Sequence, residues 1–121
     1  MSDALRLASV NVNGIRAAVR NGMHDWLGGA GVDVLTLQEV RATAADLAVA
    51  LPDWHIENDE SHTKGRSGVA IASRMAPVAV RRGLGDDTVD AAGRWIEADF
   101  EVGGQTVCVV SAYVHSGEVD T

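Results

Sequence analysis

The sequence has a single cysteine and few aromatic residues: one tyrosine, one phenylalanine and three tryptophans among 121 residues. Because Cys108 stands alone, an internal disulfide bond is excluded. It lies in the apolar run TVCVV, so we expect a buried, small hydrophobic side chain rather than a reactive thiol. No segment approaches the roughly 18 apolar residues of a membrane helix. The N-terminal MSDALRLASV also lacks the basic and apolar regions of a secretory signal. These absences favour a cytoplasmic protein without a membrane partner.

Basic residues are also scarce. Ten Lys and Arg stand against 17 Asp and Glu, which gives a net charge of −7. That balance argues against a protein that binds polyanions through its bulk charge. It does not exclude an enzyme that acts on nucleic acid, because a bound metal ion can offset phosphate charge locally. Nine of the ten basic residues are arginines, which suit bidentate phosphate contacts, but genomic base composition explains such a bias equally well.

The N-terminal part of the chain alternates between strand and helix patterns. Residues 5–12 have the pattern of an apolar strand, and residues 15–27 place apolar side chains at helical spacing before a group of glycines. Residues 32–40 predict a buried strand, because they are rich in Val and Leu. Residues 43–51 predict a short helix with Thr43 as its N-cap. This order is typical of a strand–helix–strand unit followed by a second helix.

The rest of the chain has the residue pattern of successive strands. Five segments are strand-like: 54–58, 67–73, 77–82, 94–100 and 105–114. Gly103-Gly104 predicts a tight hairpin between the last two, and we expect Trp95 to pack in the core. The order of elements predicts an α/β (α+β) fold with one mixed sheet and flanking helices. All of residues 1–121 fit within one domain.

Polar side chains stand at the ends of the first two predicted strands. Asn11 and Asn13 follow the first strand, and Gln38 and Glu39 follow the second. The Asn13-Gly14 pair resembles a hairpin turn, but the helical period that follows it indicates the start of a helix. If the two strands are parallel, these side chains meet at one edge of the sheet, and a carboxylate with amide oxygens there suits Mg²⁺. On spacing alone, helix-capping asparagines and a solvated Glu39 remain the alternative.

Five blocks occur in a fixed order: SVNVNGIR, LTLQEVR, KGRSGVAIASR, GRWIEADF and VSAYVHSGE. Together they resemble the N-terminal half of the exonuclease III branch of the endonuclease/exonuclease/phosphatase superfamily, which includes the apurinic/apyrimidinic endonucleases. The resemblance implies half of a DNase I-like, four-layer α/β sandwich. It also implies a Mg²⁺-dependent phosphodiesterase, with Mn²⁺ as the alternative metal, that acts on double-stranded DNA with abasic sites or 3′ ends. Lipid or inositol-phosphate phosphoesterases of the same superfamily are the weaker alternative.

The resemblance also assigns roles to individual residues. Glu39 matches the metal-binding glutamate of the family, and Asn11 matches an asparagine that orients the metal site or the phosphate. Asn13 matches a supporting position that helps to arrange the metal and its waters. Tyr113 matches a tyrosine whose hydroxyl contacts the scissile phosphate, a role that a phenol can fill by donating to a developing phosphorane oxygen. A half-buried tyrosine with its hydroxyl in water is the alternative for Tyr113.

The arginines that accompany these blocks come next. The resemblance implies DNA phosphate contacts for Arg41 and Arg66, with a solvated or paired arginine as the alternative for each. We expect Arg94 to brace the sheet. The sequence departs from the family at His115, where many relatives have proline, and we expect this histidine to shape a loop.

The family's G-D-x-N and S-D-H segments are not found in the sequence. In the family these segments supply the general base and the His and Asp that complete the site. We therefore expect residues 1–121 to be the N-terminal portion of a single domain, with an uncovered apolar sheet face. We expect the intact enzyme to be monomeric and this portion to be inert alone, as a folding or binding unit. The sequence does not rank exonuclease against abasic-site endonuclease.

Overall fold

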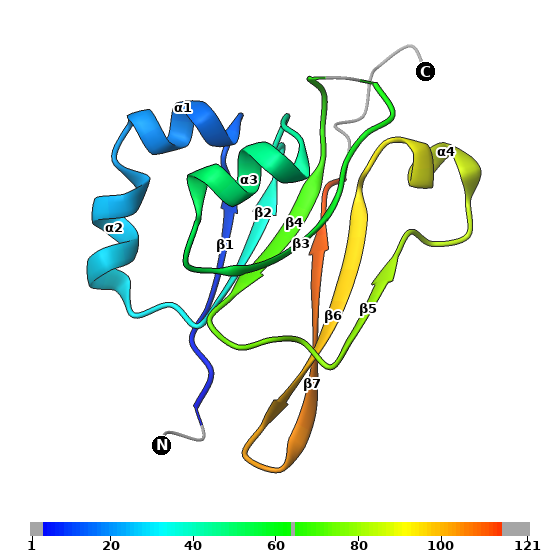
Figure 1. Ribbon diagram of the computed structural model, residues 1–121. Helices are drawn as coiled ribbons and strands as arrows, with labels where there is room; N and C mark the ends of the chain where they lie inside the picture. The colour runs from blue at the N-terminus through cyan, green and yellow to red at the C-terminus, as the bar shows by residue number, and fades with distance from the viewer. Residues whose placement is uncertain (1–3, 64, 115–121) are drawn as a thin grey trace.

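The computed structural model describes residues 4–63 and 65–114, apart from the side chains of residues 88 and 89. Figure 1 shows the order of the helices and strands along the chain. The elements are β1 (Leu7–Asn11), α1 (Ile15–Arg20), α2 (Met23–Ala30), β2 (Val34–Gln38), α3 (Ala44–Ala50), β3 (His55–Asp59), β4 (Val69–Ser73), β5 (Ala79–Arg82), α4 (Asp87–Ala91), β6 (Trp95–Val102) and β7 (Gln105–Ala112).

The strands of the described residues form two sheets. Sheet A has the order β1-β2-β4-β3, and sheet B has the order β5-β6-β7. β1 and β2 are parallel, and every other pair is antiparallel, including the predicted hairpin at Gly103-Gly104. The α/β class and the parallel first pair are confirmed. The strands do not form one mixed sheet, because β5, β6 and β7 pack across the apolar face of sheet A instead of extending its edge.

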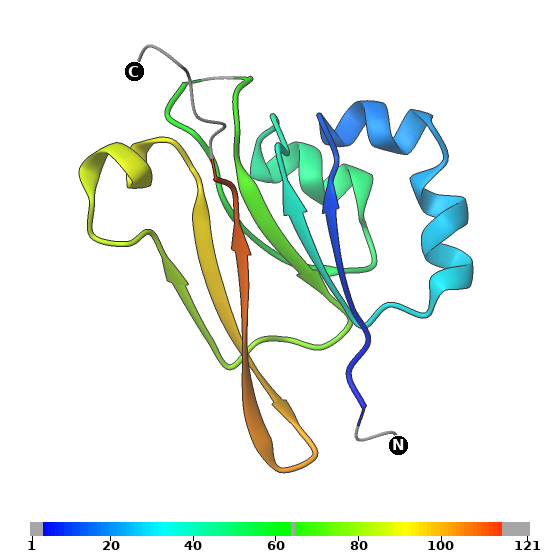
Figure 2. The same cartoon turned by 180° about the vertical axis from the view of Figure 1, so that it is seen from behind.

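Sheet A lies between helices α1, α2 and α3 on one side and sheet B on the other, as the two views in Figures 1 and 2 show; α4 lies on the sheet B side. One core fills the space between sheet A and helices α1, α2 and α3. A second core lies between the sheets, where Val34, Val69 and Ile71 pack against side chains such as Phe100. The expected uncovered face of sheet A is therefore limited to β1, where Leu7 is 52% exposed.

The helices follow the sequence pattern with one difference. The predicted helix over residues 15–27 is interrupted, because Gly22 has a φ of 102°, which favours glycine. α2 then ends at Gly31 in the left-handed conformation. The predicted N-cap of α3 is confirmed: Thr43 and Asp46 form a reciprocal capping box. No helix among the described residues is long and apolar enough to cross a membrane.

Two predictions about the core of sheet B are wrong. Cys108 is exposed, because the alternation along β7 buries Val109 and turns the thiol to the outer face of the sheet. There its sulfur lies 3.4 Å from the guanidinium of Arg81. Trp95 is half-buried on the same outer face, and its neighbour Ile96 occupies the core position instead.

Candidate active site

The carboxyl ends of β1 and β2 meet at one edge of sheet A. Asn11 lies opposite Gln38 in the parallel ladder. Beyond the strands, the Gly14 N–H donates to the carbonyl oxygen of Glu39 at 2.8 Å. The Asn-Gly pair therefore ends β1 and begins α1, and the hairpin alternative is excluded. The prediction that the two strand ends would converge is confirmed.

Three non-glycine residues at these strand ends have left-handed backbone conformations. The φ angles are 46° at Asn13, 50° at Glu39 and 54° at Arg41. Such conformations cost about 1–3 kcal/mol each and persist where the surrounding structure holds them. Here the backbone N–H of Arg41 donates to the carbonyl of Ser67 at 2.8 Å, which ties this segment to the loop before β4. Strained backbone of this kind is typical of functional sites.

The two asparagines do not act as side-chain caps of α1. Gly14 is the N-cap of this helix, and no side chain caps its first turn. The side-chain oxygen of Asn11 instead accepts a hydrogen bond from the backbone N–H of Asn13 at 3.0 Å, two residues later. This turn orients the Asn11 amide toward the end of β2, where Glu39 lies.

Glu39 is the acidic residue on which the site is centred. Hydrogen bonding from the Asn11 side chain, and next from Arg41, holds the pKa of the Glu39 carboxyl below its usual value of 4.5. Tyr113 adds a smaller contribution in the same direction. The Arg41 guanidinium lies 3.1 Å from the carboxylate, and 19% of the Glu39 side chain is exposed. The carboxylate is therefore ionised and open to solvent, as a ligand for a cation must be.

Tyr113 reaches the same site from sheet B. Its backbone N–H donates to the carbonyl of Arg94 at 2.9 Å, which holds it beside the beginning of β6. Glu39 and Tyr113 line one cavity of about 640 Å³, together with Arg66 and the segment around His62. The structure thus brings together Asn11, Glu39 and Tyr113, which the sequence analysis had assigned to one site.

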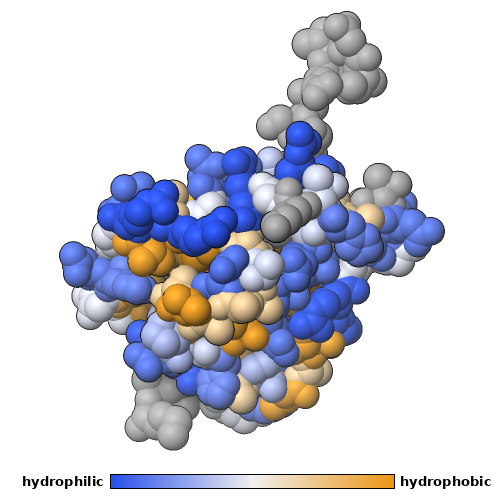
Figure 3. All heavy atoms as spheres, turned by 45° about the horizontal axis from the view of Figure 1, so that its top comes forward, coloured by the Kyte–Doolittle hydropathy of each residue, from blue (hydrophilic) through white to orange (hydrophobic). Residues whose placement is uncertain are grey.

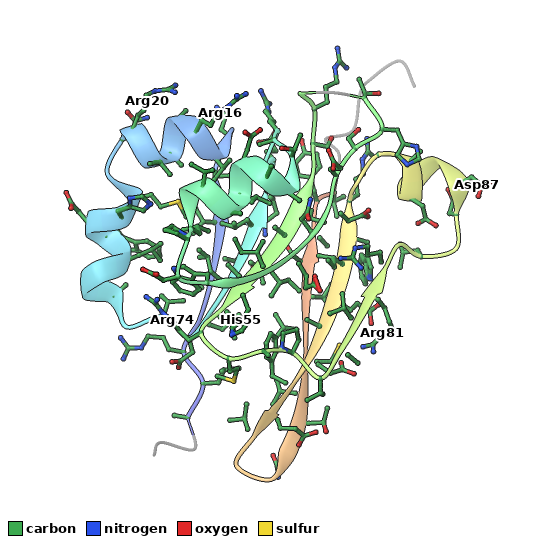
Figure 4. All side chains as sticks on the ribbon, in the orientation of Figure 1. Arg16, Arg20, His55, Arg74, Arg81 and Asp87 are labelled. Carbon is green, nitrogen blue, oxygen red and sulfur yellow. The ribbon has the colours of Figure 1, made fainter. Side chains whose placement is uncertain are left out.

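The cavity is rich in arginine. Arg41, Arg66 and Arg94 line it. A second hollow of about 540 Å³, which shares Arg41 and Arg66 with the first, is also lined by Arg16. Figure 4 shows Arg16 at the start of α1, at this end of the molecule. Arg16 accompanies one of the sequence blocks but was given no role from the sequence; the structure places it at the second hollow. Arg16 stands within the NGIR block, where the sequence predicts the start of a helix directly after the first strand. That predicted position beside the strand ends could have identified it as a residue of the site.

The bracing role of Arg94 stays a prediction, and the structure adds a second feature of this residue. Its carbonyl accepts the Tyr113 N–H, but its side chain lines the cavity. The Nε atom is buried and has no hydrogen-bond partner within the described residues. A buried guanidinium nitrogen without a partner favours an anionic group in the cavity.

The surface of this end of the molecule is hydrophilic. Figure 3 turns the end forward and shows hydrophilic side chains gathered along it. Arg81, by contrast, lies on β5 away from this end (Figure 4), where Glu97 and Asp99 pair with it on the outer face of sheet B. Arg81 is therefore a paired surface arginine outside the cavity, whereas Arg41 lines the cavity and pairs with Glu39 there.

The donors at the site fit a hard cation that keeps most of its ligands outside the protein. Among the described residues, no cluster of three or more His, Cys, Asp or Glu side chains could hold a metal ion. Glu39 offers one carboxylate, to which the Asn11 amide hydrogen-bonds. The Asn11 side-chain oxygen accepts from the Asn13 N–H and keeps a second lone pair for a cation. Mg²⁺ is often bound by one or two carboxylates with waters and substrate phosphates completing the octahedron. This donor set suits Mg²⁺ better than zinc, whose sites take three or four protein ligands from His, Cys, Asp and Glu.

The sequence analysis also missed a buried polar contact beneath the site. Gln38 and Ser111 lie on different sheets, and their side chains are 3.2 Å apart. Both residues occur in the sequence blocks quoted above, but their pairing depends on how the two sheets pack together. His115, which the sequence analysis singled out, lies outside the described residues.

Fold and site together define an α/β sandwich with a carboxylate and a tyrosine at the strand ends. The model of the endonuclease/exonuclease/phosphatase family matches residues 8–118. An exodeoxyribonuclease of Bacillus subtilis is 33% identical over 98 residues, covering 80% of this chain and 39% of the relative. The DNA repair nuclease APEX1 of Danio rerio is 33% identical over 119 residues, covering 91% of this chain and 36% of the relative.

A solved structure shows the same arrangement. The AP endonuclease of Archaeoglobus fulgidus aligns with a TM-score of 0.72 at 31% identity, covering 92% of this chain and 41% of that structure. The chain belongs to the endonuclease/exonuclease/phosphatase family. It spans less than half the length of the curated relatives described above.

Proposed function

We propose that the protein is a Mg²⁺-dependent DNA-repair phosphodiesterase, with Mn²⁺ as the alternative metal. The observation that carries the proposal is the ionised Glu39 carboxylate beside Asn11 and Tyr113 in an arginine-lined cavity. The names of relatives support the substrate class, because these are an exodeoxyribonuclease, a DNA repair nuclease and an AP endonuclease. The substrate we propose is double-stranded DNA with abasic sites or 3′ ends.

Each residue has a definite task in this proposal. Glu39 and Asn11 hold the cation, and Asn13 supports them by fixing the turn after β1. When bound, the cation would supply Lewis-acid stabilisation of a phosphate oxygen. The Tyr113 hydroxyl would donate to the same phosphate as negative charge develops on its oxygens. Arg41 and Arg66, which line both hollows, would contact phosphates of the DNA backbone there.

The local arginines resolve the apparent conflict with the net charge of −7. Bulk charge repels DNA, but screening limits that repulsion to about 8–10 Å at physiological salt. Arginines that line the cavity act within that distance on any phosphate that enters it. We propose that binding is therefore confined to this end of the molecule. We also propose that the intact enzyme is monomeric and cytoplasmic.

We propose further that residues 1–121 alone do not cleave DNA. The family resemblance assigns the general base, and the His and Asp that complete the site, to motifs that are not found in these residues. The curated relatives are more than twice as long as the segment that they share with this chain. The chain alone would then fold and bind a substrate but would not catalyse its cleavage.

The test is a nicking assay with Mg²⁺ on a duplex that carries one abasic site. It is run on the product of the complete reading frame and, separately, on residues 1–121. Glu39→Ala is the loss-of-metal variant, and Arg81→Ala is the matched surface control, because its partners lie on the outer face of sheet B. A substrate with a recessed 3′ end, run in parallel, separates exonuclease from abasic-site endonuclease activity.

We expect the complete product to nick the duplex with Mg²⁺, and Glu39→Ala or EDTA to abolish the reaction. Cleavage that persists in Glu39→Ala, or no cleavage of any DNA substrate, would overturn the proposal. Hydrolysis of an inositol phosphate in place of DNA would move the protein to another branch of the family. Cleavage by residues 1–121 that disappears in Glu39→Ala would show that the chain alone is active.

A further inference from the structure

Glu39 and Tyr113 belong to different sheets, so their separation depends on how the sheets are held together. Glu39 follows the end of β2 in sheet A, and Tyr113 follows the end of β7 in sheet B. Most of the contact between the sheets is apolar, formed by side chains such as Val34, Ile71 and Phe100. Apolar packing is strong but non-directional, and it does not by itself fix the position of one strand end against another.

A directional contact lies directly beneath the two residues. The Gln38 side-chain amide is 3.2 Å from the Ser111 hydroxyl, and the Ser111 hydroxyl donates to the carbonyl of Leu37 at 2.9 Å. Ser111 is completely buried. Two hydrogen bonds therefore join β7 to β2, one residue before Glu39 and two residues before Tyr113.

Each hydrogen bond of this contact pairs one donor with one acceptor. Ser111 uses its hydroxyl proton on Leu37, which leaves its oxygen free to accept from the Gln38 amide. The other polar neighbours of that amide are the hydroxyls of Ser9 and Thr36, at 3.2 and 3.4 Å on sheet A. Gln38 thus links the polar side chains of Ser9 and Thr36 on sheet A to Ser111 on sheet B.

We propose that Gln38 is a positioning residue: its hydrogen bond to Ser111 sets the distance between Glu39 and Tyr113. The inference rests on the proposed function for its consequence, because that distance matters only if a cation at Glu39 and the Tyr113 hydroxyl act on one phosphate. Two backbone hydrogen bonds of the described residues join the two sides of the cavity elsewhere: Gly68 N–H to Gly93 O at 3.1 Å and His62 N–H to Ala91 O at 2.8 Å. Between β2 and β7, the Ser111 hydroxyl bonds the Leu37 carbonyl, and the Gln38 amide adds the side-chain contact.

The chain offers a specific probe for the test, because Tyr113 is its single tyrosine. Incorporation of 3-fluorotyrosine gives one ¹⁹F NMR signal, whose shift reports the surroundings of Tyr113. Mn²⁺ bound at Glu39 would broaden that signal with a steep dependence on the distance between metal and ring. The measurement needs no turnover, so residues 1–121 are sufficient.

The variants separate the proposed contact from a general loss of structure. Gln38→Leu removes the amide side of the contact. Ser111→Ala removes the hydroxyl side together with the hydrogen bond to Leu37, and Ser111→Thr restores the hydroxyl. Ser9→Ala is the matched control, because it removes another neighbour of the Gln38 amide and leaves Ser111 in place. Gln38→Asn is the milder variant if Gln38→Leu does not fold, as judged by circular dichroism.

We expect Gln38→Leu and Ser111→Ala to shift the metal-free ¹⁹F signal and to lower the Mn²⁺ broadening severalfold at equal metal occupancy. Ser9→Ala and Ser111→Thr should keep the wild-type signal. A folded Gln38→Leu or Gln38→Asn variant with wild-type shift and broadening would overturn the inference. If Glu39→Gln leaves the Mn²⁺ broadening intact, the proposed metal site is wrong, whereas the metal-free shift still decides the role of Gln38.

Discussion

The guanidinium of Arg41 lies 3.1 Å from the carboxylate of Glu39, two residues earlier in the chain, and both residues have left-handed backbone. In extended backbone, the side chains of residues two apart point to the same face of the strand at a fixed spacing. Here the left-handed backbone at Glu39 and at Arg41 turns the chain instead, and the two charged groups meet at the cavity. Arg41 therefore serves as an internal partner of Glu39 in this structure and lines both hollows at this end of the molecule.

The first prediction concerns the ionisation of Glu39. Asn11→Ala should raise the pKa of the Glu39 carboxyl most, because the Asn11 side chain is the largest cause of its lowered value. Arg41→Ala should raise it less, because the charge and hydrogen bond of Arg41 rank next. Carboxyl ¹³C NMR titration measures both. Arg82→Ala is the control, since Arg82 pairs with Glu57 on a different part of the surface. An unchanged Glu39 pKa in Asn11→Ala would contradict the hydrogen bonding described here.

The second prediction concerns DNA binding. Arg66→Ala should weaken binding of an abasic duplex severalfold and reduce the slope of log K against log salt by about 0.9, the value for one lost phosphate contact. Fluorescence anisotropy at several salt concentrations measures both quantities. Arg81→Ala should leave them unchanged, because Glu97 and Asp99 already hold that guanidinium. Equal losses in Arg66→Ala and Arg81→Ala would show that bulk charge, not the cavity, governs binding.

The sequence placed one half of the site on physical grounds and the other half through the family resemblance. The strand–helix–strand length and the buried second strand sufficed to bring Asn11 beside Glu39. Nothing in periodicity places Tyr113 there, because its position depends on how sheet B packs on sheet A. That packing depends on which strands pair, and the strand-like segments after residue 54 are too similar in pattern to decide it.

The prediction for Cys108 was wrong for a related reason. The run TVCVV is continuously apolar, which is typical of a strand buried on both faces. In the structure β7 is buried on one face, and Val110 of the same run is 40% exposed on the other. The contact between Gln38 and Ser111 could not be predicted either. Two polar residues near strand ends suggest a solvated surface, whereas here they form a link between the two sheets.

The third prediction concerns the core between the sheets. Phe100 is completely buried there, so Phe100→Ala should lower the free energy of unfolding by roughly 3–5 kcal/mol, through lost burial and the cavity left behind. Urea denaturation followed by circular dichroism measures the change. Val110→Ala, on the exposed face of β7, should change stability by no more than about 0.5 kcal/mol. Similar effects of the two substitutions would contradict face-to-face packing of the sheets.

The fourth prediction concerns the dependence of stability on pH. Burial raises the pKa of the Asp59 carboxyl above its usual value of 3.8, and the nearby Asp90 adds to the rise, against Arg82 and His62. One of its oxygens is buried without a hydrogen-bond partner in the described part of the chain. Folding therefore binds a proton more tightly at Asp59, so its ionisation destabilises the folded state at neutral pH.

Asp59→Asn removes that charge and should raise the melting temperature at neutral pH. The gain should shrink as the pH falls through the raised pKa of Asp59, because the wild-type carboxyl is then protonated as well. Melting curves of both proteins at pH steps from neutral toward 4 give the difference directly. Asp87→Asn is the control, since Asp87 is exposed in the first turn of α4. A gain that grows on acidification would show that Asp59 is stabilised as a carboxylate, which is the opposite sign.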